Sequence, residues 1–158
     1  MFTFNLLNIV LSAAATLVAL SCHEFAHGWV SYKLGDPTPR MQGRLTLNPL
    51  AHLDIIGALL MVFTGFGWAK PVDINPMYYK DKVKGMSLVA LAGPLMNFIL
   101  AFLSFFIGSL ILDILNKAGL WNIGISAVIQ TFVRMFVVRN LCFMVVNLIP
   151  IPPLDGFK

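Results

Sequence analysis

Three long apolar stretches restrict this chain to folds that a lipid bilayer can solvate. They cover residues 4–34, 86–115 and 123–149. A helix needs about 20 mainly apolar residues to cross the hydrocarbon core of a bilayer, and each stretch is longer than that. The whole chain is 58% hydrophobic and 11% charged, whereas soluble domains are about 25% charged. We therefore predict an all-α, multi-pass integral membrane protein with about three transmembrane helices.

A shorter apolar segment, residues 55–69, lies between the first two stretches and falls below the ~17–25 residues of a spanning helix. Basic side chains lie on both sides of it, namely Lys33, Arg40, Arg44, Lys70, Lys80, Lys82 and Lys84. Basic loops tend to stay in the cytoplasm. We therefore predict that loops 35–54 and 70–85 are cytoplasmic and that the segment is re-entrant. The same bias explains the net charge of +4 without a nucleic-acid partner.

Residues 41–48 alternate between apolar or small and polar side chains, with Leu45 and Leu47 on the apolar side. A period of two is typical of a β-strand, so we expect a membrane-associated β-hairpin within the strand and re-entrant region, residues 40–84. Two ordinary surface loops are the alternative interpretation. An exposed strand edge at Leu45 and Leu47 would be able to pair with an unwound peptide.

The motif His23-Glu24-Phe25-Ala26-His27 lies inside the first apolar stretch. Residues four apart share one face of a helix, so the two histidines can bind one metal ion. The intervening Glu24 can then activate a water molecule there as a general base. Glu24 is the only glutamate of the chain, and an ionisable residue at membrane depth is costly unless it has a function. The alternative is a buried, hydrogen-bonded His-Glu pair that locks helices together.

A catalytic zinc ion requires a third protein ligand, for which the sequence offers two candidates. Asp155 lies in a proline-rich segment, residues 150–156, where prolines prevent a regular helix. His52 follows a turn-forming Asn-Pro pair. If residues 55–69 do not cross the membrane, the third helix brings Asp155 back toward His23 and His27. This topology favours Asp155 over His52.

Polar residues within the second and third stretches have open roles. Asn97 lies about one turn after Pro94 and can bind a substrate or a developing oxyanion, or it can satisfy the carbonyl that the proline frees. Asn147 has the same ambiguity. Arg134 and Arg139 either mark the outer membrane interface or face the interior of the helix bundle.

Taken together, the chain resembles the site-2 protease family of intramembrane zinc metalloproteases, in particular a compact prokaryotic branch. The resemblance covers residues 20–157, including segments 48–54 and 67–72, and rests mainly on His23-Glu24-Phe25-Ala26-His27, Gly93-Pro94-Leu95-Met96-Asn97 and Pro153-Leu154-Asp155-Gly156. It implies one Zn²⁺ ion bound by His23, His27 and Asp155, with Glu24 as the catalytic residue. It also implies a further helix after Lys158, so we expect a truncated chain.

The predicted function is therefore hydrolysis of peptide bonds in or beside the transmembrane segment of a protein or peptide substrate, in a prokaryotic cell membrane. We expect residues 1–158 to form a single protease core domain. Two other functions use the same histidines and aspartate: a metal-binding membrane transporter and a catalytically inactive membrane scaffold. The sequence predicts no oligomeric state.

Overall fold

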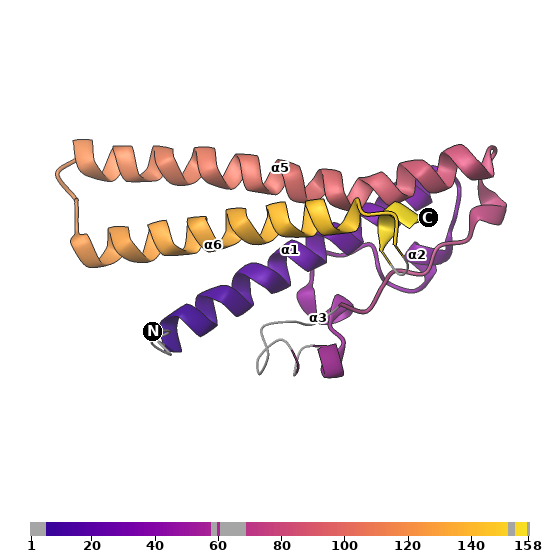
Figure 1. The fold of residues 1–158 in the computed structure, drawn as a ribbon, viewed down its shortest axis with the longest axis horizontal. Coiled ribbons are helices and arrows are strands. Elements are labelled where there is room, and N and C mark those ends of the chain that lie inside the picture. The colour runs from indigo at the N-terminus through magenta and orange to yellow at the C-terminus, as the bar shows by residue number, and fades with distance from the viewer. Residues whose placement is uncertain (1–5, 58–59, 61–68, 152–153, 158) are drawn as a thin grey trace.

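Long helices form most of the protein, as Figure 1 shows for a computed structural model. The structure describes residues 6–57, 60, 69–151 and 154–157. Within these residues, three helices are long and apolar enough to cross a membrane: α1 (Leu6–Lys33), α5 (Lys82–Lys117) and α6 (Ile123–Asn147). This confirms the predicted number of spanning helices. At ~1.5 Å per residue, α5 is about 54 Å long and exceeds the hydrocarbon core.

Local signals in the sequence determine where these helices begin and end. Asp81 accepts a hydrogen bond from the backbone amide of Lys84 and caps the start of α5. In the same way, Asn122 accepts from the amide of Ile125 at the start of α6. Side-chain caps of this kind satisfy amides that have no partner in the first turn. After α1, Gly35 adopts a φ of 105°, a value that glycine tolerates without steric cost.

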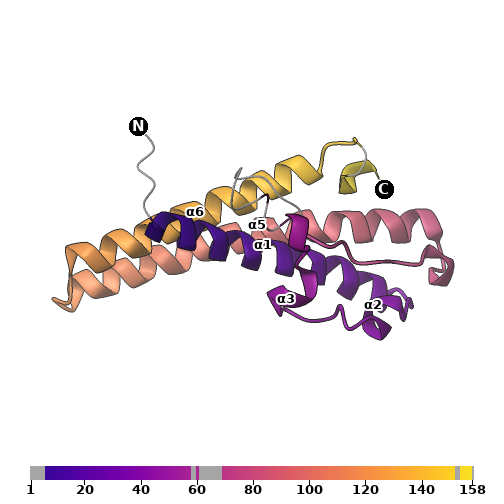
Figure 2. The ribbon, with the colours of Figure 1, turned by 90° about the horizontal axis from the view of Figure 1, so that it is seen from below.

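The long helices pack as an antiparallel bundle in which α5 contacts both α6 and α1 (Figures 1 and 2). Small and polar side chains lie inside: Ala15 and Ala19 are fully buried, and Phe136 joins them in one cluster. Large apolar side chains face outward; Phe102 and Phe105, for example, are 63% and 64% exposed. Soluble proteins bury large apolar side chains and expose polar ones, so this arrangement is the reverse of theirs. It suits helices that pack closely against one another while lipid surrounds the outside of the bundle.

Residues 41–48 do not form the predicted strand. The first of them, Met41, is the last residue of helix α2 (Thr38–Met41), and α3 (Pro49–His52) follows the segment. Gly43 has a φ of 67°, and the backbone amide of Arg44 turns back to the carbonyl of Pro39. The alternating pattern was misleading because the backbone amides of residues 41–44 donate to nearby carbonyls of residues 37–40 instead of to a partner strand. In the described part of the chain, no β-hairpin is present.

Most of the predicted re-entrant segment, 55–69, lies outside the described residues, as do two prolines of segment 150–156. The two ends of the re-entrant segment are nevertheless described. Leu53 and Ala69 form an isolated antiparallel bridge, and the amide of Lys70 donates to the carbonyl of His52 at 2.9 Å. Residue 69 therefore lies beside residue 53, so the two ends of the re-entrant segment are next to each other.

The returning chain, residues 69–75, is here called the strap, and it leads into a short 3₁₀ helix, η1 (Pro76–Tyr78). The C-terminal end of the strap is attached to a buried carboxylate, since the amide of Asn75 donates a hydrogen bond to Asp36. Asp36 also accepts hydrogen bonds from the hydroxyl of Ser31 and the amide of Thr38. Burial raises the pKa of Asp36, but these hydrogen bonds outweigh it and hold that pKa below its ordinary value. An ionised Asp36 thus ties the strap to the end of α1.

Candidate metal centre

Three potential ligand atoms meet between α1, α5 and the segment that follows α6. Nε2 of His23 and Nε2 of His27 lie 3.0 Å apart, and Oδ2 of Asp155 is 3.0 Å and 2.9 Å from them. The histidines come from one face of α1, as the spacing predicted. Asp155 opens a short 3₁₀ helix, η2 (Asp155–Phe157), which packs against α5. All three residues are buried, with exposures of 3% for His23, 5% for His27 and 6% for Asp155.

The other nitrogen of each imidazole ring is held by α5. Nδ1 of His23 donates to the side-chain oxygen of Asn97 at 2.5 Å, and Nδ1 of His27 donates to the carbonyl of Val89 at 2.6 Å. A hydrogen on Nδ1 leaves the lone pair of the neutral ring on Nε2. Both rings are therefore held in the tautomer that directs Nε2 toward Asp155. Partners of this kind orient metal-binding histidines in proteins.

Asn97 is fully buried and uses its whole amide group in this network. While its oxygen accepts from His23, its nitrogen donates to the carbonyl of Ala19 at 3.3 Å and to Asn140 at 2.7 Å. No donor of Asn97 is left for an oxyanion, so the geometry does not support that role. Asn140, on α6, is also fully buried and was missed by the sequence reasoning. The available signal was an amide side chain among apolar residues, but Gln130 and Asn147 in the third stretch carry the same signal, so it did not single out Asn140.

Glycines allow the backbone to approach the ligands closely. A Cβ atom on Gly93 would lie 2.6 Å from Nε2 of His23 and closer still to Nε2 of His27. A Cβ atom on Gly156 would lie 2.6 Å from the carbonyl oxygen of Leu148. The first glycine lets α5 pass directly beside the histidines, and the second lets the chain fold back after α6 so that Asp155 reaches them.

Glu24 lies on the neighbouring part of the α1 surface and is partly buried. Its Oε2 accepts a hydrogen bond of 3.0 Å from the backbone amide of Val72 in the strap. In the described part of the chain, its second oxygen has no hydrogen-bond partner. The carboxylate is thus held in place through one of its two oxygens.

The remaining predicted residues lie apart from the ligand group. His52 is buried in α3, where its Nε2 donates to the carbonyl of Thr46 at 2.8 Å. Asn147 is half-buried and donates to the carbonyl of Phe143. Arg139 donates to Ser12 on α1, facing the bundle, whereas Arg134 is exposed. The structure therefore brings Asp155, and not the rival His52, to the histidines.

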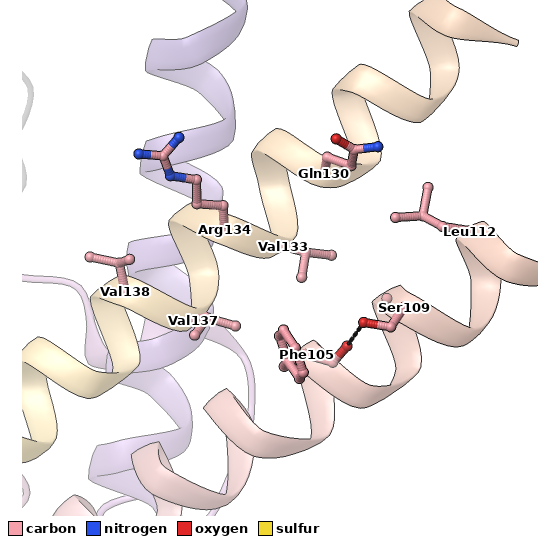
Figure 3. Close-up of a pocket in the computed structure, with 9 residues that line it drawn as sticks. Phe105, Ser109, Leu112, Gln130, Val133, Arg134, Val137 and Val138 are labelled. Atoms are coloured by element: carbon pink, nitrogen blue, oxygen red, sulfur yellow. Dashed lines mark hydrogen bonds between the residues drawn. The ribbon is translucent and has the colours of Figure 1, made fainter.

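A groove of about 310 Å³ lies between α5 and α6, away from the ligand group. In Figure 3, Val133 and Val137 project from α6 toward α5, whereas Arg134 projects to the other side of α6. The groove is bordered mainly by apolar side chains, including Phe105 and Leu112. It offers no converging polar groups, so it differs in kind from the buried centre.

The buried centre fits a zinc ion. Two neutral imidazoles and one carboxylate are one of the ligand sets found in catalytic zinc sites, which leave a fourth position open. Tetrahedral zinc separates its ligand atoms by about 3.4 Å, so the observed spacing of 2.9–3.0 Å needs to widen by only a few tenths of an ångström. With the ring hydrogens on Nδ1, Nε2 of both histidines and Oδ2 of Asp155 are all acceptors. Without a cation, these three buried atoms would have few hydrogens to share between them.

Fold and site together define a multi-pass membrane protein with a buried His-His-Asp group suited to zinc. The chain belongs to peptidase family M50, the site-2 protease family, whose profile matches residues 11–158. This confirms the resemblance seen in the motifs.

Individual relatives agree with this family. The chain is 41% identical over 143 residues to YwhC of Bacillus subtilis, which is provisionally named as a zinc metalloprotease. The match covers 90% of this chain and 64% of that protein. It is 31% identical over 154 residues to Rip2 of Mycobacterium tuberculosis, with the same provisional description, covering 94% of this chain and 55% of Rip2. The chain thus spans less than two thirds of these relatives. No solved structure matches it.

Replacing Asn97 with leucine should lower the affinity for Zn²⁺ by about 10- to 100-fold, the usual cost of losing a hydrogen bond that orients a ligand. Leucine has a similar volume but cannot accept the hydrogen on Nδ1 of His23. Competition with a chromophoric chelator measures this affinity. The matched control is Asn116→Leu, in the exposed last turn of the same helix, which should bind zinc as the wild type does. Equal affinities in the two variants would refute an orienting role for Asn97.

Proposed function

We propose that this chain is the protease core of an intramembrane zinc metalloprotease that cleaves peptide bonds in or beside substrate transmembrane segments. The observation that carries the proposal is the convergence of His23, His27 and Asp155 inside a bundle of membrane-spanning helices. Glu24, which is partly buried, directly follows His23 in the sequence. Family membership and the names of the relatives support the same chemistry. Hydrolysis of a peptide bond requires both an electrophilic centre and a base, and this bundle supplies candidates for each.

In the proposed mechanism, the two imidazoles and the Asp155 carboxylate hold the zinc. When bound there, zinc supplies a Lewis acid that polarises a peptide carbonyl and makes a water molecule more acidic. The Glu24 carboxylate takes a proton from the attacking water and later gives it to the amine that leaves. Asn97 and Val89 keep the imidazoles oriented throughout. The bundle limits access of bulk water, which strengthens these electrostatic interactions.

Substrate binding is proposed along the segment that joins α2 to α3. The side chain of Leu47 is 58% exposed, and in the described part of the chain the amides of Leu45 and Leu47 have no hydrogen-bond partner. An unwound peptide can pair with such a backbone even where no strand forms within the protein itself. Asn147, half-buried at the end of α6, is a second candidate contact. We place this segment and the strap on the cytoplasmic side of a prokaryotic cell membrane.

The proposal is tested by measuring zinc content and cleavage of a model transmembrane peptide in detergent or liposomes. We expect about one Zn²⁺ per chain, loss of cleavage when a chelator removes the metal, and recovery when Zn²⁺ is added back. The dependence on added metal distinguishes this activity from a contaminating serine or cysteine protease.

Other outcomes would favour the two alternative functions. A chain that binds zinc tightly but cleaves no transmembrane peptide would favour a metal transporter, and accumulation of Zn²⁺ in proteoliposomes would identify it. A chain without bound zinc at neutral pH would favour an inactive scaffold. Either result would overturn the protease proposal.

A further inference from the structure

Arg44 has a position that its place in a polar loop did not predict. Its exposure is only 6%, although Gln42 and Asn48 nearby are exposed. Nη1 of the guanidinium donates to the carbonyl of Ala51, and Nη2 donates to the carbonyl of Pro71 at 3.3 Å. Arg44 has no carboxylate partner in the described residues, so a buried cation here bonds to two backbone oxygens.

One of those oxygens belongs to the peptide group that reaches Glu24. The carbonyl of Pro71 and the amide N–H of Val72 are the two ends of a single planar peptide unit. Arg44 donates to the oxygen end, and the hydrogen end donates to Oε2 of Glu24 at 3.0 Å. A cation, a peptide dipole and a carboxylate are therefore connected in series. In such a chain each hydrogen bond polarises the next one.

We propose that Arg44 is a positioning residue for the catalytic Glu24 and that it acts through the Pro71–Val72 peptide group. This inference rests on the proposed function, in which Glu24 is the general base. By holding one carboxylate oxygen on the strap, the peptide directs the other oxygen toward the reacting water. The side chain of Arg44 fixes the plane of that peptide, and its charge strengthens the amide as a donor.

Other contacts hold the strap without touching this peptide, which separates positioning from general support. Asp36 binds the amide of Asn75 at the far end of the strap, and Gln42 donates to Asp73. Val72 itself packs its side chain toward Gly28 on α1. The strap therefore remains attached to α1 when Arg44 is altered, while the orientation of its 71–72 peptide loses its guanidinium partner.

The first test is the Arg44→Lys variant of the zinc-loaded protein. Lysine keeps the positive charge but cannot donate to two carbonyls with the fixed fork of a guanidinium. We expect kcat for peptide cleavage to fall by about 10-fold, since misplacing a reacting group by ~1 Å can cost up to ~100-fold. KM and zinc affinity should stay unchanged. The matched control is Arg40→Lys, an exposed arginine that donates to the hydroxyl of Tyr32 and should keep wild-type kinetics.

The second test leaves every side chain intact. Incorporating the α-hydroxy acid analogue of valine at position 72 replaces the amide N–H with an ester oxygen and removes the bond to Glu24. We expect kcat to fall by about 10- to 100-fold, the range for losing a hydrogen bond to a charged group. The control is the ester analogue at Ile74, whose amide has no hydrogen-bond partner in the described residues.

The outcomes separate this inference from the proposed function. If the wild type cleaves no peptide, the proposed function fails first. If the wild type cleaves and the Val72 ester has the same kcat, the amide does not position Glu24 and the inference is wrong. If Arg44→Lys raises KM or releases zinc without changing kcat, Arg44 is only a structural clamp, which also overturns the inference.

Discussion

Replacing Glu24 with glutamine should abolish peptide cleavage, with a loss of at least ~100-fold, while the protein still binds one zinc ion. General acid–base catalysis by a positioned side chain contributes about 10²–10⁴-fold. Glutamine has the same length as glutamate, and its amide oxygen can still accept the hydrogen bond from Val72. What it loses is the ability to take up a proton. The variant therefore removes the base and leaves the local packing in place.

Zinc content and cleavage rate must be measured on the same preparation. The matched control is Asp113→Asn, which neutralises a half-exposed carboxylate that pairs with Lys117 at the far end of α5. Its activity should equal that of the wild type, showing that loss of one negative charge is not enough. If Glu24→Gln retained a chelator-sensitive activity near the wild-type rate, another group would have to be the base.

The second large effect is expected from Gly93→Ala, which should prevent zinc binding and so eliminate cleavage. The added methyl carbon would lie 2.6 Å from Nε2 of His23, well inside van der Waals contact, in the space where the ligand atoms converge. Alanine also favours a helix by about 1 kcal/mol over glycine. A loss of zinc could not then be explained by weakening of α5.

Zinc stoichiometry by elemental analysis and the melting temperature check this prediction together. We expect a folded protein with far less than one zinc per chain. The control is Gly124→Ala near the start of α6, where the nearest atom to an added Cβ is Oδ1 of Asn122 at 3.3 Å, so that only a small adjustment is needed. A Gly93→Ala protein with a full complement of zinc would show that the histidines are not held beside α5 as described.

Much of the site could be predicted because its information is local or topological. The His-x-x-x-His spacing sets two imidazoles on one helical face whatever surrounds them. The lengths and charges of the apolar stretches fix the number of helices, and an antiparallel path then returns Asp155 to the histidines. The same reasoning preferred Asp155 over His52, which the structure places in a separate hydrogen bond.

The parts that were missed depend on which way individual groups point. Alternation in residues 41–48 indicated a strand with Arg44 among its polar side chains. A positive φ at Gly43 and a local turn instead direct Arg44 inward. The bond between Val72 and Glu24 is made by a backbone amide and leaves no signature in the side-chain sequence. Likewise, Asn140 could be suspected as a buried amide, but its partner could not be chosen from the sequence.

The separation of the ligands along the chain also governs when the centre can exist during biosynthesis. His27 and Asp155 are 128 residues apart. At translation rates of about 5–20 residues per second, Asp155 is added roughly 6–26 s after His27. During that interval the first helix carries its histidines without Asp155, so the complete proposed zinc site can form only after the third helix has been synthesised. The proposed protease, assembled in this order, would gain activity only once its bundle is closed, which would spare neighbouring membrane proteins from a half-made protease.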